Sequence, residues 1–179
     1  MPGEIQIRSL ATLGDSEIKG LSDLLIDCVE GGASIGFMLP TGPPMPRAKA
    51  ERFWQTVSAS VARGERIVLV AEDPSGTIVG TVQVILNQPE NQPHRGEIAK
   101  MIVHRRLRRQ GVGAALLSAA EHRALRAGKT LLVLDTASDD AERLYARQGW
   151  QRCGKIPNYA LWLDGTPCAT TIFFKSLRD

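Results

Sequence analysis

Apolar residues recur along the chain with two kinds of spacing, which predict a series of strands and helices. Segments rich in β-branched residues predict strands, whereas apolar residues three or four positions apart predict helices. The expected strands cover residues 4–10, 66–72, 77–86, 97–104, 130–135 and 169–177. Four helices are expected. The first is capped by Asp15 or Ser16 and ends at Gly31, and the second has Pro46 at its first position and ends at Gly64. The other two cover residues 111–127 and 139–147. The predicted order is therefore β-α-α-β-β-β-α-β-α-β.

Turn sequences and the order of the elements indicate a mixed sheet. The turn residues 73–76 (DPSG) separate two expected strands, which should therefore form an antiparallel hairpin. The strand at 97–104 is followed by a helix and then by the strand at 130–135, and such a crossover makes the two strands parallel. The continuous apolar run at 130–135 is typical of a strand buried on both faces of a sheet. The sequence thus predicts an α/β (α+β) fold with one parallel strand pair in a mostly antiparallel sheet.

Residues 31–46 read GGASIGFMLPTGPPMP and interrupt the regular pattern. The prolines and glycines exclude regular structure there, yet Ile35, Phe37, Met38 and Leu39 are too apolar for a solvated linker. Long apolar loops of this kind are more often lids or binding loops than spacers.

The composition is that of an ordinary globular protein, and it excludes several classes. The chain has 179 residues, 43% of them hydrophobic, so we expect a single domain over residues 1–179. A formal charge of +3 is too small to indicate a nucleic-acid partner, and no run of about 18 apolar residues predicts a membrane span. Cys28, Cys153 and Cys168 are far apart and show no metal-ligand spacing. This pattern predicts a cytoplasmic protein without a metal.

The most informative stretch is residues 103–114, VHRRLRRQGVGA, which join an expected strand to a helix N-terminus. Free N–H groups and the helix dipole favour an anion there, and Gly111 and Gly113 let a phosphate approach the backbone. Arg108 and Arg109 add positive charge that suits phosphate oxygens. Three other interpretations remain: a tight turn only, a solvated basic face, or a nucleic-acid patch. The dinucleotide fingerprint fails because Leu116 replaces its third glycine, and no Walker Gly-Lys-Ser/Thr follows.

Two segments together resemble the signatures of the GNAT acetyltransferase superfamily. Residues 103–113 resemble its acetyl-CoA-binding motif V-x-P-x-x-R-G-x-G-[IV]-G, and residues 144–150 (LYARQGW) resemble its second signature L-Y-x-x-x-G-F. Arg105 stands in place of the usual proline, Arg109 in place of a frequent glycine, and Trp150 in place of phenylalanine. The resemblance implies the GNAT fold, a twisted mixed sheet with a central parallel pair and helices on both faces. It also implies acetyl-CoA as co-substrate.

The resemblance assigns the cofactor site to the end of one strand and the start of the following helix. Backbone groups of residues 110–114 would hold the pyrophosphate, and residues 101–103 would pair with the pantetheine arm like an added strand. A backbone N–H near Val103 would stabilise the oxyanion. Ser138 stands where many members have an asparagine that contacts the cofactor. The expected cofactor-binding residues are Met101, Ile102, Val103, Arg108, Arg109, Gln110, Gly111, Val112, Gly113, Ala114 and Ser138.

Acetyl transfer to an amine requires a neutral amine and a proton for the leaving thiolate. A free alkylamine has a pKa of about 10, so a base is needed near neutral pH. Glu97 and Asp135 are the candidate bases, although each could instead be structural or orient a cationic substrate. Tyr145 is the candidate acid, and the alternative is that its ring only packs against the sheet. Lys100 is interpreted as a charge on the sheet face, and Cys28 as a core residue, which disfavours an acetyl-cysteine intermediate.

A closer resemblance covers most of the chain and suggests the acceptor. Residues 31–38, 134–136, 157–159 and 174–175 are similar to the tabtoxin-resistance acetyltransferases, which N-acetylate a β-lactam amino acid. It implies an enzyme that acetylates a small-molecule amine, with a β-lactam amino acid toxin as one candidate, by direct attack in a ternary complex. The acceptor pocket would be walled by residues 31–46, 87–96 and 157–167. Two alternatives remain: a protein N-terminal or lysine acetyltransferase, and a non-catalytic acyl-CoA-binding module. Many relatives form homodimers, so a homodimer is a candidate assembly.

Overall fold

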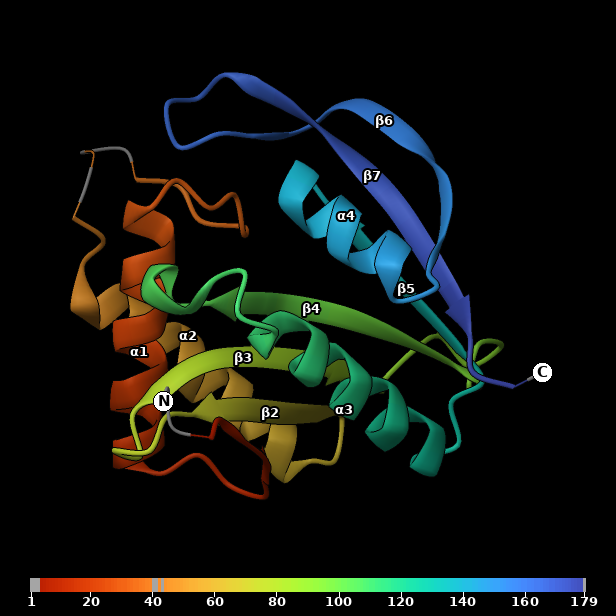
Figure 1. Cartoon of the computed structure of the whole chain (residues 1–179), viewed down its shortest axis with the longest axis horizontal. Coiled ribbons are helices and arrows are strands. Elements are labelled where there is room, and N and C mark those ends of the chain that lie inside the picture. Colours follow the sequence, from red (N-terminus) through yellow and green to blue (C-terminus); the bar gives the residue numbers. More distant parts are fainter. Residues whose placement is uncertain (1–3, 40–41, 43, 179) are drawn as a thin grey trace.

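The computed structural model describes residues 4–39, 42 and 44–178, which form a sheet covered by helices (Figure 1). The elements in chain order are β1 (Gln6–Leu10), α1 (Asp15–Glu30), α2 (Arg47–Ala62), β2 (Arg66–Glu72), β3 (Ile78–Ile85), β4 (Arg95–Val103), the 3₁₀ turn η1 (Arg105–Leu107), α3 (Val112–Arg126), β5 (Leu131–Thr136), α4 (Asp139–Arg147), β6 (Gln151–Leu161) and β7 (Pro167–Ser176). Every expected strand and helix is therefore present, and β6 is additional.

The strands form one sheet in the order β1-β2-β3-β4-β5-β7-β6. β4 and β5 are parallel, whereas the other neighbouring strands are antiparallel. This confirms the predicted hairpin of β2 and β3 and the predicted parallel pair. In the described part of the chain, no helix is long and apolar enough to cross a membrane.

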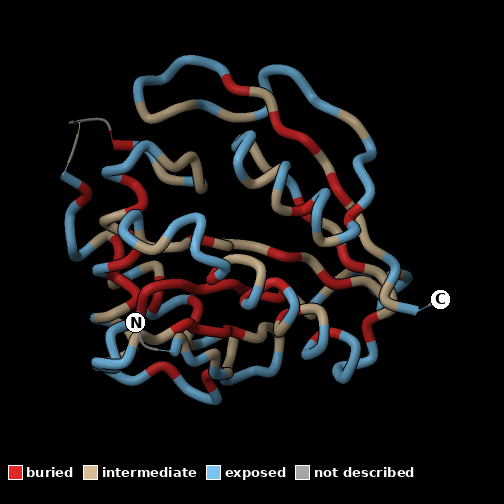
Figure 2. Tube along the Cα trace, viewed as in Figure 1, coloured by how far each residue is buried: buried red, intermediate tan, exposed pale blue. Residues whose placement is uncertain are grey.

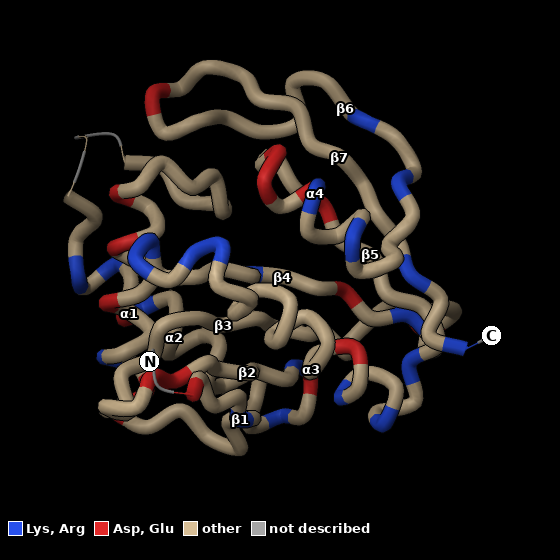
Figure 3. The backbone as a smooth tube through the Cα atoms, viewed as in Figure 1, with Lys and Arg blue, Asp and Glu red and all other residues tan. Residues whose placement is uncertain are grey.

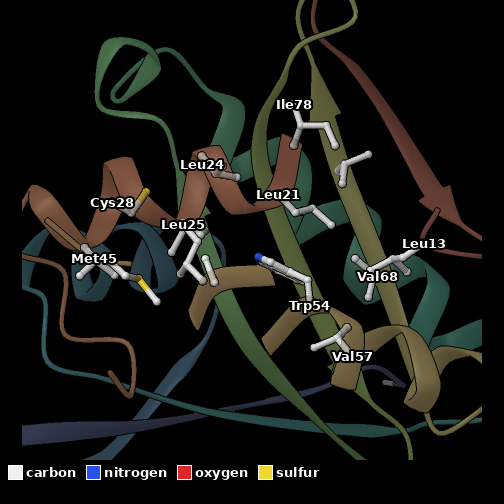
Figure 4. Close-up of a cluster of buried hydrophobic side chains, with 14 of the residues drawn as sticks. Leu13, Leu21, Leu24, Leu25, Cys28, Met45, Trp54, Val57, Val68 and Ile78 are labelled. Atoms are coloured by element: carbon white, nitrogen blue, oxygen red, sulfur yellow. The ribbon is translucent and has the colours of Figure 1, made fainter. Parts of the chain in front are cut away.

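The core has two layers because successive strand residues point to opposite faces of the sheet. On one face Val68 and Val70 pack against α1 and α2, where Leu21, Leu25 and Trp54 are fully buried (Figure 4). The other face is covered by α3 and α4, whose buried residues pack against the strand residues that point to that side. These are Leu116, Leu117, Ala120 and Tyr145 on the helices and Leu69, Ala71, Val82 and Leu132 on the strands. Helices thus cover both faces, as predicted.

The sequence pattern missed β6, an edge strand paired only with β7 in the sheet order. Its residues are almost all exposed (Figure 2), so it lacks the alternation of buried and exposed positions that reveals a strand. Gly154 and Pro157 add to the irregular appearance, and an edge strand tolerates both. The segment 157–167, expected to wall the acceptor pocket, consists of the end of β6, the turn at residues 162–166 and the first residue of β7.

Three local expectations were also wrong. β5 is not buried on both faces: Leu132 and Leu134 are buried, but their strand neighbours are half-buried or exposed. The cap of α1 is Gly14, whose N–H donates to the Glu17 carboxylate at 3.1 Å, so neither Asp15 nor Ser16 caps this helix. Pro46 is the N-cap of α2 and not its first helical residue.

β4 and β5 pair only at their beginnings and then diverge (Figure 1). Their last register pair in the described chain is Glu97 with Val133, although β4 continues to Val103 and β5 to Thr136. The sheet therefore opens between the carboxyl ends of two parallel neighbours, where α/β sheets commonly bind ligands.

Candidate functional site

The turn from β4 into α3 has the features of an anion cradle. Gly111, with φ +85°, precedes α3 in the left-handed conformation that glycine adopts most easily. The first intrahelical bond joins Ala115 N–H to the Gly111 carbonyl at 3.0 Å, so the amides of residues 112–114 have no acceptor within the helix. A Cβ on Gly113 would lie 3.2 Å from a Leu144 methyl group, which makes a small residue the best fit between α3 and α4. These features suit a bound phosphate.

Positively charged residues gather on the turn between β4 and α3 (Figure 3). Two arginines of this basic run anchor the turn to the rest of the molecule. The Arg105 side chain donates to Asp27 at 2.9 Å, its backbone N–H donates to the same carboxylate at 3.0 Å, and Arg106 donates to Asp73 at 2.7 Å. Burial alone would raise the pKa of Asp27, but the hydrogen bonds from Arg105 hold it below its ordinary value. Arg105, which replaces the proline of the motif, therefore has a structural partner on α1.

The other two arginines are closer to the expected phosphate site. Arg108 Nε donates to the Val103 carbonyl at 3.2 Å, at the end of β4. The Arg109 side chain is 83% exposed and lies 3.5 Å from Asp140 at the start of α4. Arg109 has φ +61°, a left-handed conformation at the position where the motif often has glycine. Both guanidinium groups border the turn, and Arg109 is the freer of the two to contact a ligand.

The backbone at the end of β4 is directed toward the opening in the sheet. Ile102 is opposite Thr81, and the His104 N–H donates to the Val79 carbonyl at 2.8 Å. In an antiparallel pair, the backbone N–H and C=O groups of successive residues point alternately toward and away from the neighbouring strand. Since the His104 N–H points to β3, the backbone groups of Val103 point away from β3, toward the side where β5 has diverged. The Val103 carbonyl accepts from Arg108 Nε and from the Cys28 thiol, and the Val103 N–H is directed toward the same open side.

Tyr145 lies on α4 and is 5% exposed. Its ring packs against Trp150 at 5.9 Å and Phe173 at 5.7 Å between ring centroids. Burial raises the pKa of the phenol, and the nearby negative charge of Asp135 raises it further. The packing of the ring is thus observed, and the role of Tyr145 as the acid stays a prediction.

The two candidate carboxylates lie on the sheet face opposite Tyr145. Ile98 and Leu134 pack in the same cluster as Tyr145, so their strand neighbours Glu97 and Asp135 point to the other face. Glu97 is 43% exposed at its side chain and lies 3.6 Å from Arg95. Asp135 Oδ2 accepts a 2.7 Å hydrogen bond from the Thr170 hydroxyl on β7. The structure thus brings both carboxylates to one face, beside the opening between β4 and β5.

Lys100 lies on this same side, and the sequence interpretation of it was incomplete. It is half-buried, and its Nζ lies 5.7 Å from the centroid of the Phe53 ring on α2. In a regular strand Lys100 would share a face with Ile98 and Ile102, both of which are buried. A lysine between two core positions was the signal in the sequence that this strand is irregular.

Ser138 and Cys28 each have a structural partner. Ser138 Oγ accepts from the Ala141 N–H at 3.3 Å and caps α4, so this side chain has a role without any cofactor. Cys28 is buried, and burial raises the pKa of its thiol to about 11. Among residues 4–39, 42 and 44–178, no three His, Cys, Asp or Glu side chains are arranged to hold a metal ion.

The described residues of the loop at 31–46 pack over α2 and reach β7. The Phe37 ring meets the Phe53 ring edge-on at 5.2 Å, and Lys49 donates to the Met38 carbonyl at 2.5 Å. Ser34 Oγ lies 4.0 Å from Cys168 Sγ on β7. The described part of this loop therefore lies on the α1/α2 side of the sheet, the side of Glu97 and Asp135.

A sequence model of the acetyltransferase (GNAT) family matches residues 37–150, and the chain belongs to that family. It is an acetyl-CoA-dependent N-acetyltransferase. Solved structures with the same fold include a presumed phosphinothricin N-acetyltransferase, with 16% identity, a TM-score of 0.75, and coverage of 98% of this chain and 100% of that chain. Another is yncA, a presumed acetyltransferase from Salmonella typhimurium with its cofactor acetyl-CoA, with 18% identity, a TM-score of 0.75, and coverage of 99% and 96%.

A third structure shows that the same fold also occurs with a different acceptor. The ribosomal-protein-alanine N-acetyltransferase from Brucella melitensis has 20% identity and a TM-score of 0.73, with coverage of 96% of this chain and 99% of that chain. At these identities the likeness shows the fold, and the acceptor has to be argued from the site.

Proposed function

We propose that this enzyme acetylates the amine of a small molecule by direct attack on acetyl-CoA within a ternary complex. The observation that carries the proposal is the opening between β4 and β5 beyond Glu97 and Val133. The anion cradle and Tyr145 belong to the α3/α4 side of this opening, and Glu97 and Asp135 to the α1/α2 side. Two substrates would then approach from opposite faces and meet within the sheet.

The residues at the start of α3 fit the pyrophosphate of acetyl-CoA. The amides of residues 112–114, which have no acceptor within the helix, would donate to its oxygens, with Arg108 and Arg109 adding charge and Gln110 bordering the turn. The end of β4, from Met101 to Val103, would pair with the pantetheine arm. When bound, acetyl-CoA supplies the acetyl group and a thiolate leaving group. The Val103 N–H would donate to the acetyl oxygen as negative charge develops there.

The proton transfers would be divided between the two faces. Glu97 or Asp135 would accept the proton that the acceptor amine loses, and Tyr145 would donate a proton to the departing sulfur. The products are an amide and a free thiol. From a neutral amine, the nitrogen loses one proton to the base and the sulfur gains one from the acid, so the transfer balances. Cys28 does not compete as a nucleophile because its thiol is buried and protonated.

A small polar acceptor is favoured by Phe37, in the described part of the loop at 31–46, which packs against Phe53 over the acceptor face. A toxin or antibiotic with an amino group, such as a β-lactam amino acid, is our candidate, and the fold is shared with a presumed phosphinothricin N-acetyltransferase. A ribosomal-protein-alanine acetyltransferase shares the fold as well, so protein acceptors are the competing proposal. The free cysteines fit a reducing compartment, and we propose a cytoplasmic enzyme.

An acceptor screen with a Tyr145→Phe variant tests the proposal. Purified enzyme is mixed with acetyl-CoA and small amines, or with peptides, and thiol release and product mass are measured. Tyr145→Phe should lower kcat by about 100-fold with little change in acetyl-CoA affinity, because the ring packing remains. The Tm of Tyr145→Phe is the control, since loss of the hydroxyl alone should leave the packing of the ring against Trp150 and Phe173 in place.

Acetylation of peptides alone would contradict the small-molecule proposal. Binding of acetyl-CoA without transfer to any acceptor would favour the non-catalytic module. A Tyr145→Phe enzyme with unchanged kcat would remove Tyr145 from the acid role. Light scattering of the same samples will show whether the enzyme is a homodimer.

A further inference from the structure

Lys100 is the residue at which β4 bulges. Ala99 is opposite Gln83 and Ile102 is opposite Thr81, so Lys100 and Met101 together face a single residue of β3. Lys100 has φ +48°, a left-handed conformation that is unfavourable for lysine and must be held by its surroundings. Such strained residues concentrate at functional sites, which makes the direction of this side chain informative.

The bulge directs the Lys100 side chain toward α2 and the loop at residues 31–46. A Cβ on Gly36 would lie 3.6 Å from Nζ, and Nζ lies 5.7 Å from the Phe53 ring centroid. Burial lowers the pKa of the Lys100 amine, and the positive charge of Arg66 lowers it further, while Asp135 and Glu97 act in the opposite direction. No ion pair or hydrogen bond joins Nζ to any residue that the structure describes. The ammonium group is thus partly desolvated and has donors to spare.

Arg66 is a second cation on the same face. It begins β2 opposite Ile85, which is in turn opposite Glu97, so Arg66 and Glu97 lie in one row across the sheet. Arg66 is half-buried and donates to the Gln83 side chain, but its Nε is buried without a partner in the described chain. Two cations and two carboxylates therefore share the acceptor side of the opening.

Building on the proposed acetyl transfer, we propose that Lys100 binds a carboxylate of the acceptor and so selects small amines that also carry a carboxylate, such as amino acids. The carboxylate would take the unused donors of Lys100 in a site where water is partly excluded. Arg66 would add positive potential, and Glu97 and Asp135 would receive the acceptor's amino group. A polyamine would place a second positive charge beside Lys100, so the same residue disfavours amines without a carboxylate.

Two other roles for Lys100 fit the structure less well. A cofactor phosphate is an unsuitable partner, because the anion cradle at α3 belongs to the opposite face of the sheet. A purely structural ammonium would be expected to pair with a carboxylate or carbonyl, as Lys129 does with the Leu86 and Pro93 carbonyls, both at 2.8 Å.

Matched acceptors and a charge-removing variant test this proposal. The twenty protein amino acids and ornithine are compared with their methyl esters, and lysine and ornithine also with cadaverine and putrescine. The readout is kcat/KM from thiol release, with the product identified by mass. We expect the wild-type enzyme to prefer the acid over its ester, and Lys100→Gln to reduce this preference about 10- to 100-fold, mainly through KM. Lys100→Arg should retain most of it.

Controls separate this proposal from the function on which it rests. Lys19→Gln removes the same charge from an exposed position of α1 and should leave the preference unchanged. Acetyl-CoA affinity, measured by calorimetry, shows whether Lys100→Gln is folded, and Lys100→Arg supplies a second folded variant. Transfer to esters or polyamines in preference to acids, or an unchanged preference in Lys100→Gln, would overturn the role of Lys100 while acetyl transfer stands. Absence of transfer to every acceptor would overturn the proposed function itself.

Discussion

Substitutions at Gly111 separate the shape of the anion cradle from its charge. Gly111 has φ +85°, and no atom lies within 4 Å of a Cβ built there, so a side chain meets strain but no collision. For an ordinary residue the left-handed conformation costs about 1–2 kcal/mol, and Asn tolerates it better. In a protein of this size, each kcal/mol lowers Tm by about 2–4 °C. Gly111→Ala should therefore lose a few degrees in Tm, and Gly111→Asn less.

Gly111→Glu adds a negative charge to the same strain. At a separation of about 6 Å and an effective dielectric constant of about 40–80, repulsion between two unit charges is about 0.7–1.4 kcal/mol. A pyrophosphate with two charges would then bind about 1.5–3 kcal/mol more weakly, a loss of roughly 10- to 100-fold in affinity.

Calorimetric titration of the Gly111 variants with acetyl-CoA measures this effect. Gly111→Asn should bind almost as tightly as the wild type, Gly111→Ala slightly less, and Gly111→Glu far less, with a loss that shrinks at high salt. Affinity that is equal in all four proteins would place the pyrophosphate elsewhere. Dephospho-CoA, titrated in parallel, shows whether Arg108 and Arg109 read the terminal phosphate.

Three further predictions concern the base, the anchored turn and the buried thiol. Glu97→Gln or Asp135→Asn should lower kcat/KM by about 100-fold or more, and full activity in both variants would exclude either carboxylate as the base. The pKa of Asp27 is lower in the folded state than in the unfolded chain. The stabilisation by its carboxylate is therefore fully present above the unfolded-state pKa and is lost as the pH falls through the folded-state pKa. Asp27→Asn should remove this decrease of Tm in acid, and a decrease of the same size in the variant would contradict the prediction. Cys28, with a pKa of about 11, should resist iodoacetamide at pH 8 while exposed Cys153 reacts, and mass spectrometry of peptides will show whether it does.

The sequence predicted those elements whose burial produces a regular pattern. β2 and β3 alternate between two buried faces and are joined by a turn sequence, so their hairpin was evident. β6 was missed because an edge strand with exposed residues carries no such pattern. The uneven burial of β5 was missed because its apolar run does not reveal how far α1 and α2 extend across the sheet.

The candidate site shows the same division between local and long-range information. The turn with Gly111 and Gly113 that precedes α3 was predictable because it is contained in one contiguous segment. The common face of Glu97 and Asp135 depends on the parallel register of β4 and β5, which spacing alone does not fix. The direction of Lys100 depends on a bulge in β4 and on packing against α2, and both arise from contacts distant in sequence.

Initial-rate kinetics with both substrates varied test the central proposal, that the amine and acetyl-CoA meet in one complex across the opening between β4 and β5. Double-reciprocal plots at several acceptor concentrations should give intersecting lines, and acetylated enzyme should not accumulate when the acceptor is omitted. Parallel lines, together with a stable acetyl-enzyme detected by mass spectrometry, would show a covalent intermediate and contradict the proposed direct attack.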